Sequence, residues 1–392
     1  MKILHAVESY FPAVGGMQEV VKQLSERMAE HGFDVTVATR KHEARDFSEK
    51  SGVKIIDFDI SGNMVNGIIG EKDKYEQLLL NNDFDVIVFF AAQQWATDIA
   101  LPLLDKIKAR KVCVPTGYSG LYLPEYKAYF EDMKRWIHNF DMNVYLSDDY
   151  RDINFARSCG VSKMMLIPNG ASEEEFDNKS TIDVKKELGI PDDHFLILHV
   201  GSYTGAKGHN EAMEIFYRSN LKKTTFLMIG NNYEAFKKHN KFSLMFFLRK
   251  VLARYKDNKE IIFSYFPRPF TVAAYQQADL FLFPSNIECS PIVLFESAAA
   301  KLPFLTTECG NAAEIIKWTE GGEALKTIKK NDGFVIADID ASVKQLEEIY
   351  LNKSKRIRFG QNGYKNWKLK FTWEKISSDY VNLYQQLIKQ RS

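Results

Sequence analysis

The sequence predicts an α/β fold built from two successive doubly wound halves. Along its 392 residues, short apolar runs of strand length alternate with segments of helical spacing. The alternation stops near residue 170 at a charged, turn-rich stretch and then starts again. A strand, a helix and a second strand in succession place the two strands parallel, and repeated units of this kind give a sheet with helices on both faces.

The first half begins with a strand and a glycine-rich turn. Ile3–Val7 is a short apolar run, and Gly15 and Gly16 lie in the turn that follows it. Residues 18–31 then carry apolar side chains at helical spacing, and Gly32 ends this helix. Further strands of this half are expected at 35–39, 53–58, 86–90, 111–114 and 142–146.

The second half repeats the pattern. Phe195–Val200 predicts its first strand, 201–208 a loop that contains glycine, and 211–218 a helix. Further strands are expected at 225–229, 261–264, 280–283, 304–306 and 333–335. We therefore expect two Rossmann-like domains, an N-terminal one at 1–175 and a C-terminal one at 190–371, with ligands at the carboxyl ends of the strands.

The composition is that of an ordinary globular protein and argues against several classes of protein. Hydrophobic residues make up 45% of the chain and charged residues 26%, and the net charge of +1 gives no basis for a nucleic-acid partner. The four cysteines have neither disulfide nor metal-ligand spacing, which indicates a reduced, cytoplasmic protein without a metal site. Neither a signal peptide nor a transmembrane run is expected.

The most informative stretch runs from Glu288 to Glu296. It follows a strand-like run that ends at Pro284-Ser285, and it leads into a segment of good helix formers. A helix that starts near Pro291 offers free N–H groups and a favourable dipole to phosphate, and Glu296 is expected about two turns into it. Because carboxylates accept hydrogen bonds from hydroxyls, the stretch predicts a site for a sugar nucleotide.

These segments, in this order, resemble the retaining family-4 glycosyltransferases of the GT-B fold. That family shows Glu, seven residues and Glu after a Pro-Ser pair, then a helix of small residues, a proline-containing strand, and a Gly followed by a Glu. Here the strand is Leu302–Thr306, and Gly310 and Glu314 follow it. The resemblance extends along nearly the whole chain. It implies two domains facing across a cleft, with the last helix, 372–392, crossing back to the N-terminal domain.

The resemblance implies a metal-independent, retaining glycosyltransferase of the hexosyl type. Such an enzyme moves a sugar from a nucleoside diphosphate donor, most often a UDP- or GDP-sugar, to a hydroxyl of a glycan, a lipid-linked glycan or a small acceptor. Synthesis of cell-surface polysaccharides or glycoconjugates is the expected setting. No cofactor is expected beside the sugar nucleotide substrate.

The resemblance also implies roles for residues on the donor side. Glu296 would hold the ribose hydroxyls, and Glu288 the donor sugar or the reacting centre. Lys207 would bind the diphosphate, which Gly201 allows the backbone to approach. The expected set is Lys207 and Glu288 for catalysis, and Glu296, Gly201, Ser202, Ile292, Val293, Ser290 and Arg268 for donor binding, with the N–H groups of Ile292 and Val293 on phosphate. The alternatives are that Lys207 is an ordinary lysine in a solvated loop and that Glu296 is an ordinary charge on a helix surface.

Two positions on the donor side depart from the family pattern. Ser202 stands where the family usually has an arginine, directly after the glycine that ends the strand. Either Arg268 supplies the second cation for the diphosphate, or Lys207 and backbone groups suffice. Pro291 stands where many members carry glycine, and its lack of an N–H group bears on which sugar is chosen.

On the acceptor side, the expected residues are Gly15, Gly16, Thr116 and Tyr118. The two glycines let the backbone approach a ligand, and Tyr118 begins a tyrosine-rich loop whose rings can pack against sugars. Ordinary packing is the alternative for both features. Many relatives carry a histidine where this chain has Thr116, and others carry one where it has 91–94.

A basic segment at 236–256 flanks an apolar run and contains no acidic residue. A basic amphipathic helix can rest on an anionic membrane surface, but an enlarged connecting helix that packs on its own domain is the favoured interpretation. The expected location is the cytoplasm, including the inner face of the membrane if this segment binds it.

Three alternative functions share the architecture. A sugar-nucleotide epimerase is disfavoured by the missing histidines, and a glycogen-type phosphorylase by the chain length and its need for pyridoxal phosphate. A catalytically impaired sugar-nucleotide-binding or scaffold protein is kept open by Ser202 and by Thr116-Gly117.

Overall fold

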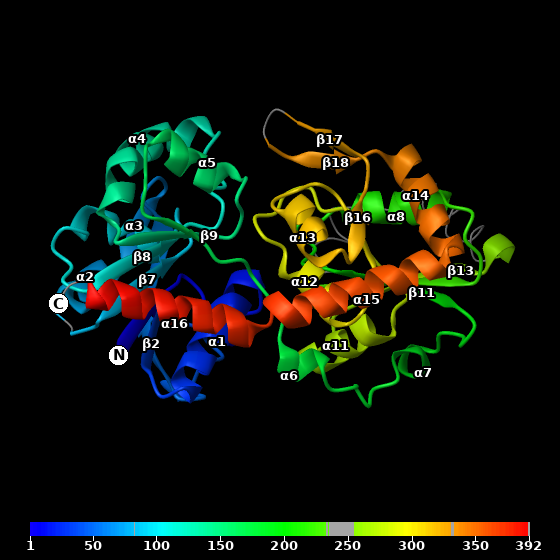
Figure 1. The fold of residues 1–392 in the computed structure, drawn as a ribbon, viewed down its shortest axis with the longest axis horizontal. Coiled ribbons are helices and arrows are strands. Elements are labelled where there is room, and N and C mark those ends of the chain that lie inside the picture. Colours follow the sequence, from blue (N-terminus) through cyan, green and yellow to red (C-terminus); the bar gives the residue numbers. More distant parts are fainter. Residues whose placement is uncertain (82, 233, 235–254, 331–332, 391–392) are drawn as a thin grey trace. The chain divides into compact units, whose positions relative to one another are not determined.

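The chain folds into two units, as seen in a computed structural model that describes residues 1–81, 83–232, 234, 255–330 and 333–390 (Figure 1). The first unit comprises Met1–Asn169 and Trp373–Ser392, and the second Gly170–Thr372. Each unit is an α/β structure around its own, almost entirely parallel sheet. The predicted fold class is therefore confirmed.

The first unit contains an eight-stranded sheet in the order β10-β9-β8-β7-β1-β2-β4-β3. Its strands are β1 (Lys2–Ala6), β2 (Asp34–Arg40), β3 (Glu49–Lys50), β4 (Val53–Phe58), β7 (Val86–Phe90), β8 (Arg110–Val114), β9 (Met142–Tyr145) and β10 (Met164–Leu166). All neighbours pair in parallel except β3 and β4. The strands β5 (Ile60–Asn63) and β6 (Gly67–Gly70) form a separate hairpin.

The helices of the first unit include the last helix of the chain. They are α1 (Gly16–Glu30), α2 (Lys72–Asn81), α3 (Trp95–Asp98), α4 (Lys127–Trp136), α5 (Arg151–Ser158) and α16 (Trp373–Lys389), with short 3-10 helices at Leu101–Leu103, Pro124–Tyr126 and Ile137–Asn139. One face of α16 is apolar, and its buried side chains include Tyr380, Leu383 and Leu387. This face packs against α1, so α16 belongs to the core of the first unit.

The second unit contains a six-stranded parallel sheet in the order β13-β12-β11-β14-β15-β16. Its strands are β11 (Phe195–Val200), β12 (Thr224–Ile229), β13 (Lys259–Ser264), β14 (Leu280–Phe283), β15 (Phe304–Thr306) and β16 (Gly322–Ala324). Its helices are α6 (Glu173–Phe176), α7 (Val184–Leu188), α8 (His209–Arg218), α11 (Arg268–Gln277), α12 (Ile292–Ala299), α13 (Ala312–Thr319), α14 (Ile339–Leu351) and α15 (Lys353–Lys370). Side chains from α11 and α12 fill one core cluster of this sheet, and those from α8 and α14 fill another.

The strand expected at 333–335 begins only at Val335, and it lies outside the main sheet. The strand β18 (Val335–Ala337) pairs with β17 (Thr327–Lys329) in a separate antiparallel ribbon, and β16 takes the edge of the main sheet instead. The first residue of β16 explains this, because a Cβ atom on Gly322 would lie 2.2 Å from the carbonyl oxygen of Phe304. The edge position thus depends on a close backbone approach and not on an apolar run.

The second unit begins at Gly170, earlier than the boundary at 190 that the charged stretch suggested. The cause is that this stretch is anchored to α11. Gln277 accepts a hydrogen bond from the N–H of Val184 at 2.9 Å, and its amide donates to the carbonyl of Ile182. Val184 and Ile190 are buried in the core of the second unit.

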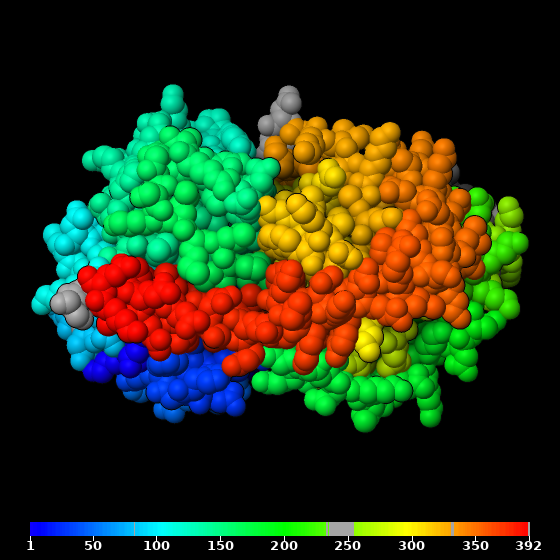
Figure 2. All heavy atoms as spheres, viewed as in Figure 1, coloured from blue at the N-terminus to red at the C-terminus, as the bar shows by residue number. Residues whose placement is uncertain are grey.

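The two ends of the second unit lie side by side. Ala171 and Thr372 form a parallel β-bridge, and the N–H of Ala171 donates to the carbonyl of Phe371 at 3.0 Å. Trp367, which is fully buried on α15, donates its indole N–H to the carbonyl of Ala171. The outer side of α15 is seen in orange on the surface of the second unit (Figure 2).

No helix in the described part of the chain is long and apolar enough to cross a membrane. Most of the basic segment at 236–256 lies outside the described residues, and its two proposed roles stay predictions.

Candidate active site

The strand order of the second unit reverses between β11 and β14. These two strands are neighbours, while the chain continues from β11 toward one edge of the sheet and from β14 toward the other. In other open α/β sheets, ligands bind at the carboxyl ends of the strands at such a switch point. The loop after β11 carries Gly201 and Lys207, and the loop after β14 carries Ser285 and Glu288.

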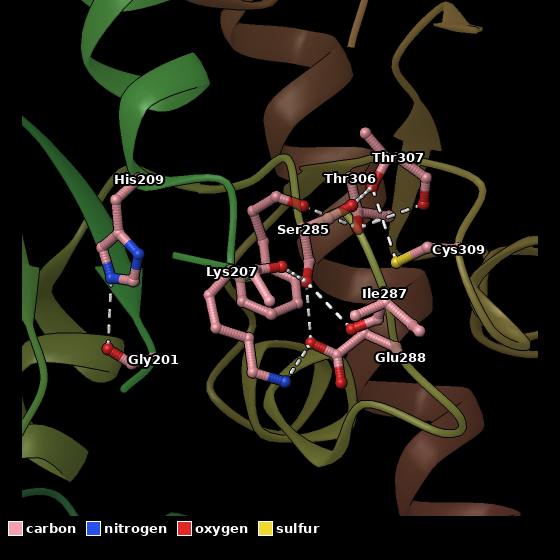
Figure 3. A network of polar contacts seen from close by, with 11 residues as sticks. Gly201, Lys207, His209, Ser285, Ile287, Glu288, Thr306, Thr307 and Cys309 are labelled. Atoms are coloured by element: carbon pink, nitrogen blue, oxygen red, sulfur yellow. Dashed lines mark hydrogen bonds and ion pairs between the residues drawn. The ribbon is translucent and has the colours of Figure 1, made fainter. Parts of the chain in front are cut away.

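Lys207 and Glu288 meet at this point (Figure 3). The ammonium Nζ of Lys207 is 2.6 Å from Oε1 of Glu288, and the hydroxyl of Ser285 donates to the same oxygen at 2.8 Å. The side chains remain 28% and 10% exposed, so solvent and small ligands can reach them. The two residues that the sequence assigned to catalysis are thus brought together from loops 81 positions apart.

The approach of the two loops depends on Gly208. Its φ of +67° lies in the left-handed region, and an added Cβ atom would lie 1.8 Å from the carbonyl oxygen of Pro284. A direct hydrogen bond joins the loops as well, because the N–H of Asn286 donates to the carbonyl of Ala206 at 2.9 Å.

Two buried histidines lie beneath the loop after β11. His209, the first residue of α8, contacts the carbonyl of Gly201 through Nε2 at 3.2 Å, and its ring centroid is 4.5 Å from that of His199. Burial lowers the pKa of His209 to about 4 and that of His199 well below its usual range. Both rings are therefore neutral at physiological pH and support the loop without adding charge.

The helix α12 begins at Ile292, with Pro291 as its N-cap. Ile292 and Val293 are its first two residues, where N–H groups have no partner within the helix. Glu296 is the fifth residue and lies little more than one turn into the helix, so the expected two turns are wrong. It is only 3% exposed, in contrast to an ordinary charge on a helix surface.

Glu296 forms an ion pair with Arg268. The guanidinium Nη2 is 2.6 Å from Oε1 of Glu296, and Arg268 also bonds both carboxylate oxygens of Glu175. Glu175 could not be expected at this position from the sequence, because it belongs to a run of three glutamates that is typical of a solvated helix start.

Residues after β15 support the loop that contains Ser290. The N–H of Asn311 donates to the carbonyl of Cys289 at 2.9 Å, and its side-chain amide donates to the hydroxyl of Ser290 at 3.2 Å. Gly310 permits this contact, because a Cβ atom there would lie 2.4 Å from the Cys289 carbonyl. Ser202, on the opposite loop, accepts a hydrogen bond from the N–H of Thr204 through its own carbonyl.

The first unit has its own group of unusual backbone conformations at the carboxyl ends of β7 and β8. Ala91, Gln93, Thr116 and Tyr118 all have φ between 45° and 64°, a range that is uncommon for residues other than glycine. Such strained residues concentrate at functional sites. Two of the expected acceptor-side residues, Thr116 and Tyr118, are among them.

Asp98 holds this strained backbone in place. It is fully buried and accepts hydrogen bonds from the N–H of Gln93 at 3.2 Å and from the hydroxyl of Tyr129 at 2.8 Å. Burial raises the pKa of Asp98 to about 6. The amide oxygen of Gln93 in turn accepts from the N–H of Gly120 at 3.1 Å, which ties the loop after β7 to the tyrosine-rich loop.

The surroundings of Tyr118, Gly16 and Gly15 differ from one another. Tyr118 is 1% exposed, and its ring packs edge-on against Phe130 and Phe155, which favours the packing alternative. A Cβ atom on Gly16 would meet nothing within 4 Å, so packing does not require glycine there. A Cβ atom on Gly15 would meet only the flexible end of Gln18.

In the ranges that the structure describes, no three His, Cys, Asp or Glu side chains are grouped closely enough to hold a metal ion.

Sequence comparisons identify the family. The family model described as Glycosyl transferases group 1 matches residues 180–366, and the one described as Glycosyltransferase Family 4 matches residues 14–175. The chain belongs to the family-4 glycosyltransferases of the GT-B fold. The match to Glycosyl transferases group 1 covers both Lys207 and the stretch from Glu288 to Glu296.

Individual proteins are similar to the chain over its full length. The chain is 23% identical to an uncharacterized glycosyltransferase of Methanocaldococcus jannaschii, with 98% of each chain covered. It is 22% identical to the O-antigen chain mannosyltransferase C of Escherichia coli, with 100% of each covered. Among solved structures, Anabaena HepE in complex with UDP and glucose superposes with a TM-score of 0.75 at 13% identity, over 98% of this chain and 100% of that one.

Proposed function

We propose that the protein is a retaining glycosyltransferase that moves a hexose-type sugar from a nucleoside diphosphate to a hydroxyl of a glycan or lipid-linked glycan. The observation that carries the proposal is the Lys207–Glu288 ion pair at the point where the strand order of the second unit reverses. The buried carboxylate of Glu296 and the N-terminus of α12 belong to the same unit.

The donor is proposed to bind through complementary chemistry at each of its parts. Lys207 and the N–H groups of Ile292 and Val293 bind the diphosphate, because an ammonium and a helix N-terminus both favour negative charge. Glu296 accepts hydrogen bonds from the ribose hydroxyls, and Glu288 from the sugar. Ser202 and Ser290 can add hydroxyl contacts without charge.

In the proposed reaction, the acceptor oxygen forms a bond to the anomeric carbon of the sugar on the face that the diphosphate leaves. The bond from that carbon to the diphosphate oxygen breaks with its electron pair. The proton of the acceptor hydroxyl passes to the departing phosphate, so no protein base is required. The main task of Lys207 is then to stabilise the charge that develops on the diphosphate.

Relatives guide the choice of substrates. One is a mannosyltransferase that acts on an O-antigen chain, and another structure holds UDP and glucose. We therefore propose a UDP- or GDP-sugar as donor and a growing cell-surface polysaccharide or glycoconjugate as acceptor. A cytoplasmic location, with transient contact to the inner face of the membrane, would suit a lipid-linked acceptor.

The test combines binding and turnover. Uridine, guanosine, adenosine, cytidine and thymidine diphosphates are screened by thermal unfolding, and the corresponding sugar donors are then assayed for product with glycan acceptors. We expect one base to raise the unfolding midpoint and its sugar donor to give a product with retained anomeric configuration by NMR. A ligand at 100 times its dissociation constant adds roughly 2.7 kcal/mol, which is readily detected.

A binding protein without transferase activity is the second candidate, because Ser202 replaces the usual arginine. It would be supported by a clear shift with one nucleotide but no product with any acceptor. If no nucleotide shifts the midpoint and no donor is turned over, both functions are wrong.

A further inference from the structure

Arg268 lies between two carboxylates of the second unit. Its Nη2 is 2.6 Å from Oε1 of Glu296, while Nε and Nη2 donate to the two oxygens of Glu175 at 3.0 and 2.5 Å. We infer that Arg268 is a positioning residue that fixes the Glu296 carboxylate for the ribose hydroxyls of the donor, and that Glu175 fixes Arg268. The inference rests on the proposed function, in which Glu296 accepts those hydroxyls.

Three separate elements contribute to this arrangement. Glu296 lies on α12, Arg268 is the first residue of α11, and Glu175 lies on α6, directly after the start of the second unit. Because Glu296 is 3% exposed, its charge requires a nearby cation, and Arg268 supplies it. A carboxylate can accept several hydrogen bonds, so Glu296 can accept from hydroxyls while it is paired with Arg268.

The rigid, planar guanidinium of Arg268 fixes the position of the Glu296 carboxylate relative to that of Glu175. Nη2 carries two hydrogens at a fixed angle, and this one nitrogen contacts both Glu175 and Glu296. The bidentate contact with Glu175 sets the plane of the guanidinium, and the ring of Phe176 lies 5.9 Å from Cζ. Lysine has a single nitrogen with freely rotating hydrogens, so it would supply the charge but not the angle.

The charge balance argues against the role that the sequence suggested for Arg268. One guanidinium and two carboxylates carry a net charge of −1 when all are ionised. A guanidinium neutralised in this way attracts a diphosphate weakly, whereas an anionic group remains well suited to accept hydrogen bonds from ribose hydroxyls. Arg268 is thus better placed to act through Glu296 than to replace the arginine missing at Ser202.

The test compares ribose recognition in the wild type and three variants, Arg268→Ala, Arg268→Lys and Glu175→Gln. Affinities for uridine and guanosine diphosphates and their 2′-deoxy forms are measured by calorimetry. In the wild type we expect the 2′-deoxy form of the preferred nucleotide to bind on the order of tenfold more weakly, because Glu296 loses a hydrogen-bond donor. The ratio of the affinity for the nucleotide to the affinity for its 2′-deoxy form should fall toward one in Arg268→Ala. In Arg268→Lys it should lie between the values for Arg268→Ala and the wild type.

Inorganic pyrophosphate separates the two roles of Arg268. If Arg268 acts through Glu296, Arg268→Ala should bind pyrophosphate nearly as the wild type does, while its affinity for the nucleotide drops on the order of tenfold. An equal loss for pyrophosphate and nucleotide would identify Arg268 as a diphosphate cation and overturn the inference. The inference would also be overturned if Arg268→Ala and the wild type had the same ratio of nucleotide affinity to 2′-deoxynucleotide affinity.

Two controls keep the result interpretable. Arg356 is a half-buried arginine of the same unit whose guanidinium lies over Phe195, at the amino end of β11. Arg356→Ala should lower stability without changing the ratio. If Arg268→Ala does not fold, Glu175→Gln provides the test. Without the Glu175 carboxylate, Arg268 should be held less firmly, and the ratio of nucleotide to 2′-deoxynucleotide affinity should again fall. A wild type that binds no nucleotide refutes the proposed function itself, whereas normal wild-type binding with unchanged ratios refutes only the role of Arg268.

Discussion

Lys207 is held by Glu288 at 2.6 Å, in the candidate site of the second unit. When a diphosphate binds, we expect its charge to attract the ammonium from this ion pair and the Glu288 carboxylate to turn to the sugar. Lys207 thus has a partner in either state. This explains how a charged side chain can be largely sheltered and still be available to a ligand.

Lys207→Ala should lower kcat at saturating donor by two to three orders of magnitude, as expected for loss of one group that stabilises transition-state charge. The measurement is initial rates over a range of donor concentrations, with the unfolding midpoint as a check on folding. Lys223→Ala is the matched control, because Lys223 forms an exposed ion pair with Asp193 elsewhere in the same unit. Wild-type rates in Lys207→Ala would exclude it from the reaction.

The buried histidines make the stability of the second unit depend on pH. Burial lowers the pKa of His209 from 6.5 to about 4, so between these values the unfolded chain binds more protons than the folded one. Its contribution to the free energy of unfolding is complete above pH 6.5 and is lost as the pH falls toward 4. The change is on the order of 3 kcal/mol. Asp98 belongs to the first unit, and its pKa, raised to about 6, affects the stability of that unit in the opposite direction: its contribution is lost as the pH rises from 3.8 through 6.

His209→Gln should reduce the difference in unfolding free energy between pH 7 and pH 4.5, because glutamine does not titrate. Urea unfolding at the two pH values measures this difference. His138→Gln, at an exposed histidine of the first unit, should leave it unchanged. An equal difference in His209→Gln and the wild type would show that His209 does not drive the effect.

At the scale of elements, the loops after β11 and β14 depend on a single glycine. Gly208→Ala adds a Cβ atom 1.8 Å from the Pro284 carbonyl, so the loops must separate and Lys207 must leave Glu288. We expect nucleotide binding to be lost and the unfolding free energy to fall by more than the roughly 1–2 kcal/mol that the left-handed conformation alone explains.

Gly189→Ala provides the matched control for that variant. Gly189 ends α7 in the same unit with a φ of +65°, and an added Cβ atom would meet nothing within 4 Å. It should show the conformational cost by itself, without loss of nucleotide binding. Calorimetry and denaturant unfolding on both variants make the comparison, and equal effects would mean that the close approach to Pro284 is unimportant.

Most strands of both sheets could be predicted from the sequence because each is a short apolar run between turn signals. The edge strand β16 could not, since its Gly-Glu-Ala sequence has no apolar pattern and its position depends on a backbone contact with Phe304. The same limit applies to the candidate site. Lys207, Glu288 and Glu296 were found by their motif, whereas the pairing of Arg268 with Glu175 joins residues 93 positions apart and leaves no local signal.

At the scale of the whole molecule, α16 makes the stability of the first unit depend on the C-terminus. Leu383 is 2% exposed on the face that packs against α1. Leu383→Ala should destabilise the first unit by about 2–5 kcal/mol. Differential scanning calorimetry should show a lower first-unit transition, while a bound nucleotide still raises the transition of the second unit.

Asn382→Ala, at an exposed position of the same helix, serves as its control and should leave both transitions in place. If Leu383→Ala lowers nucleotide affinity as strongly as it lowers stability, the two units do not respond independently.

The β-bridge between Ala171 and Thr372 means that the chain leaves the first unit and returns to it at neighbouring points. The second unit is therefore one continuous segment of the chain, and the first unit is made from the segments on either side of it. Recombination with two crossovers, one at each end of the bridge, would exchange the whole second unit for that of another family member. If the second unit binds the donor, as proposed, a new donor preference could be acquired in one genetic event without a change in the sequence of the first unit.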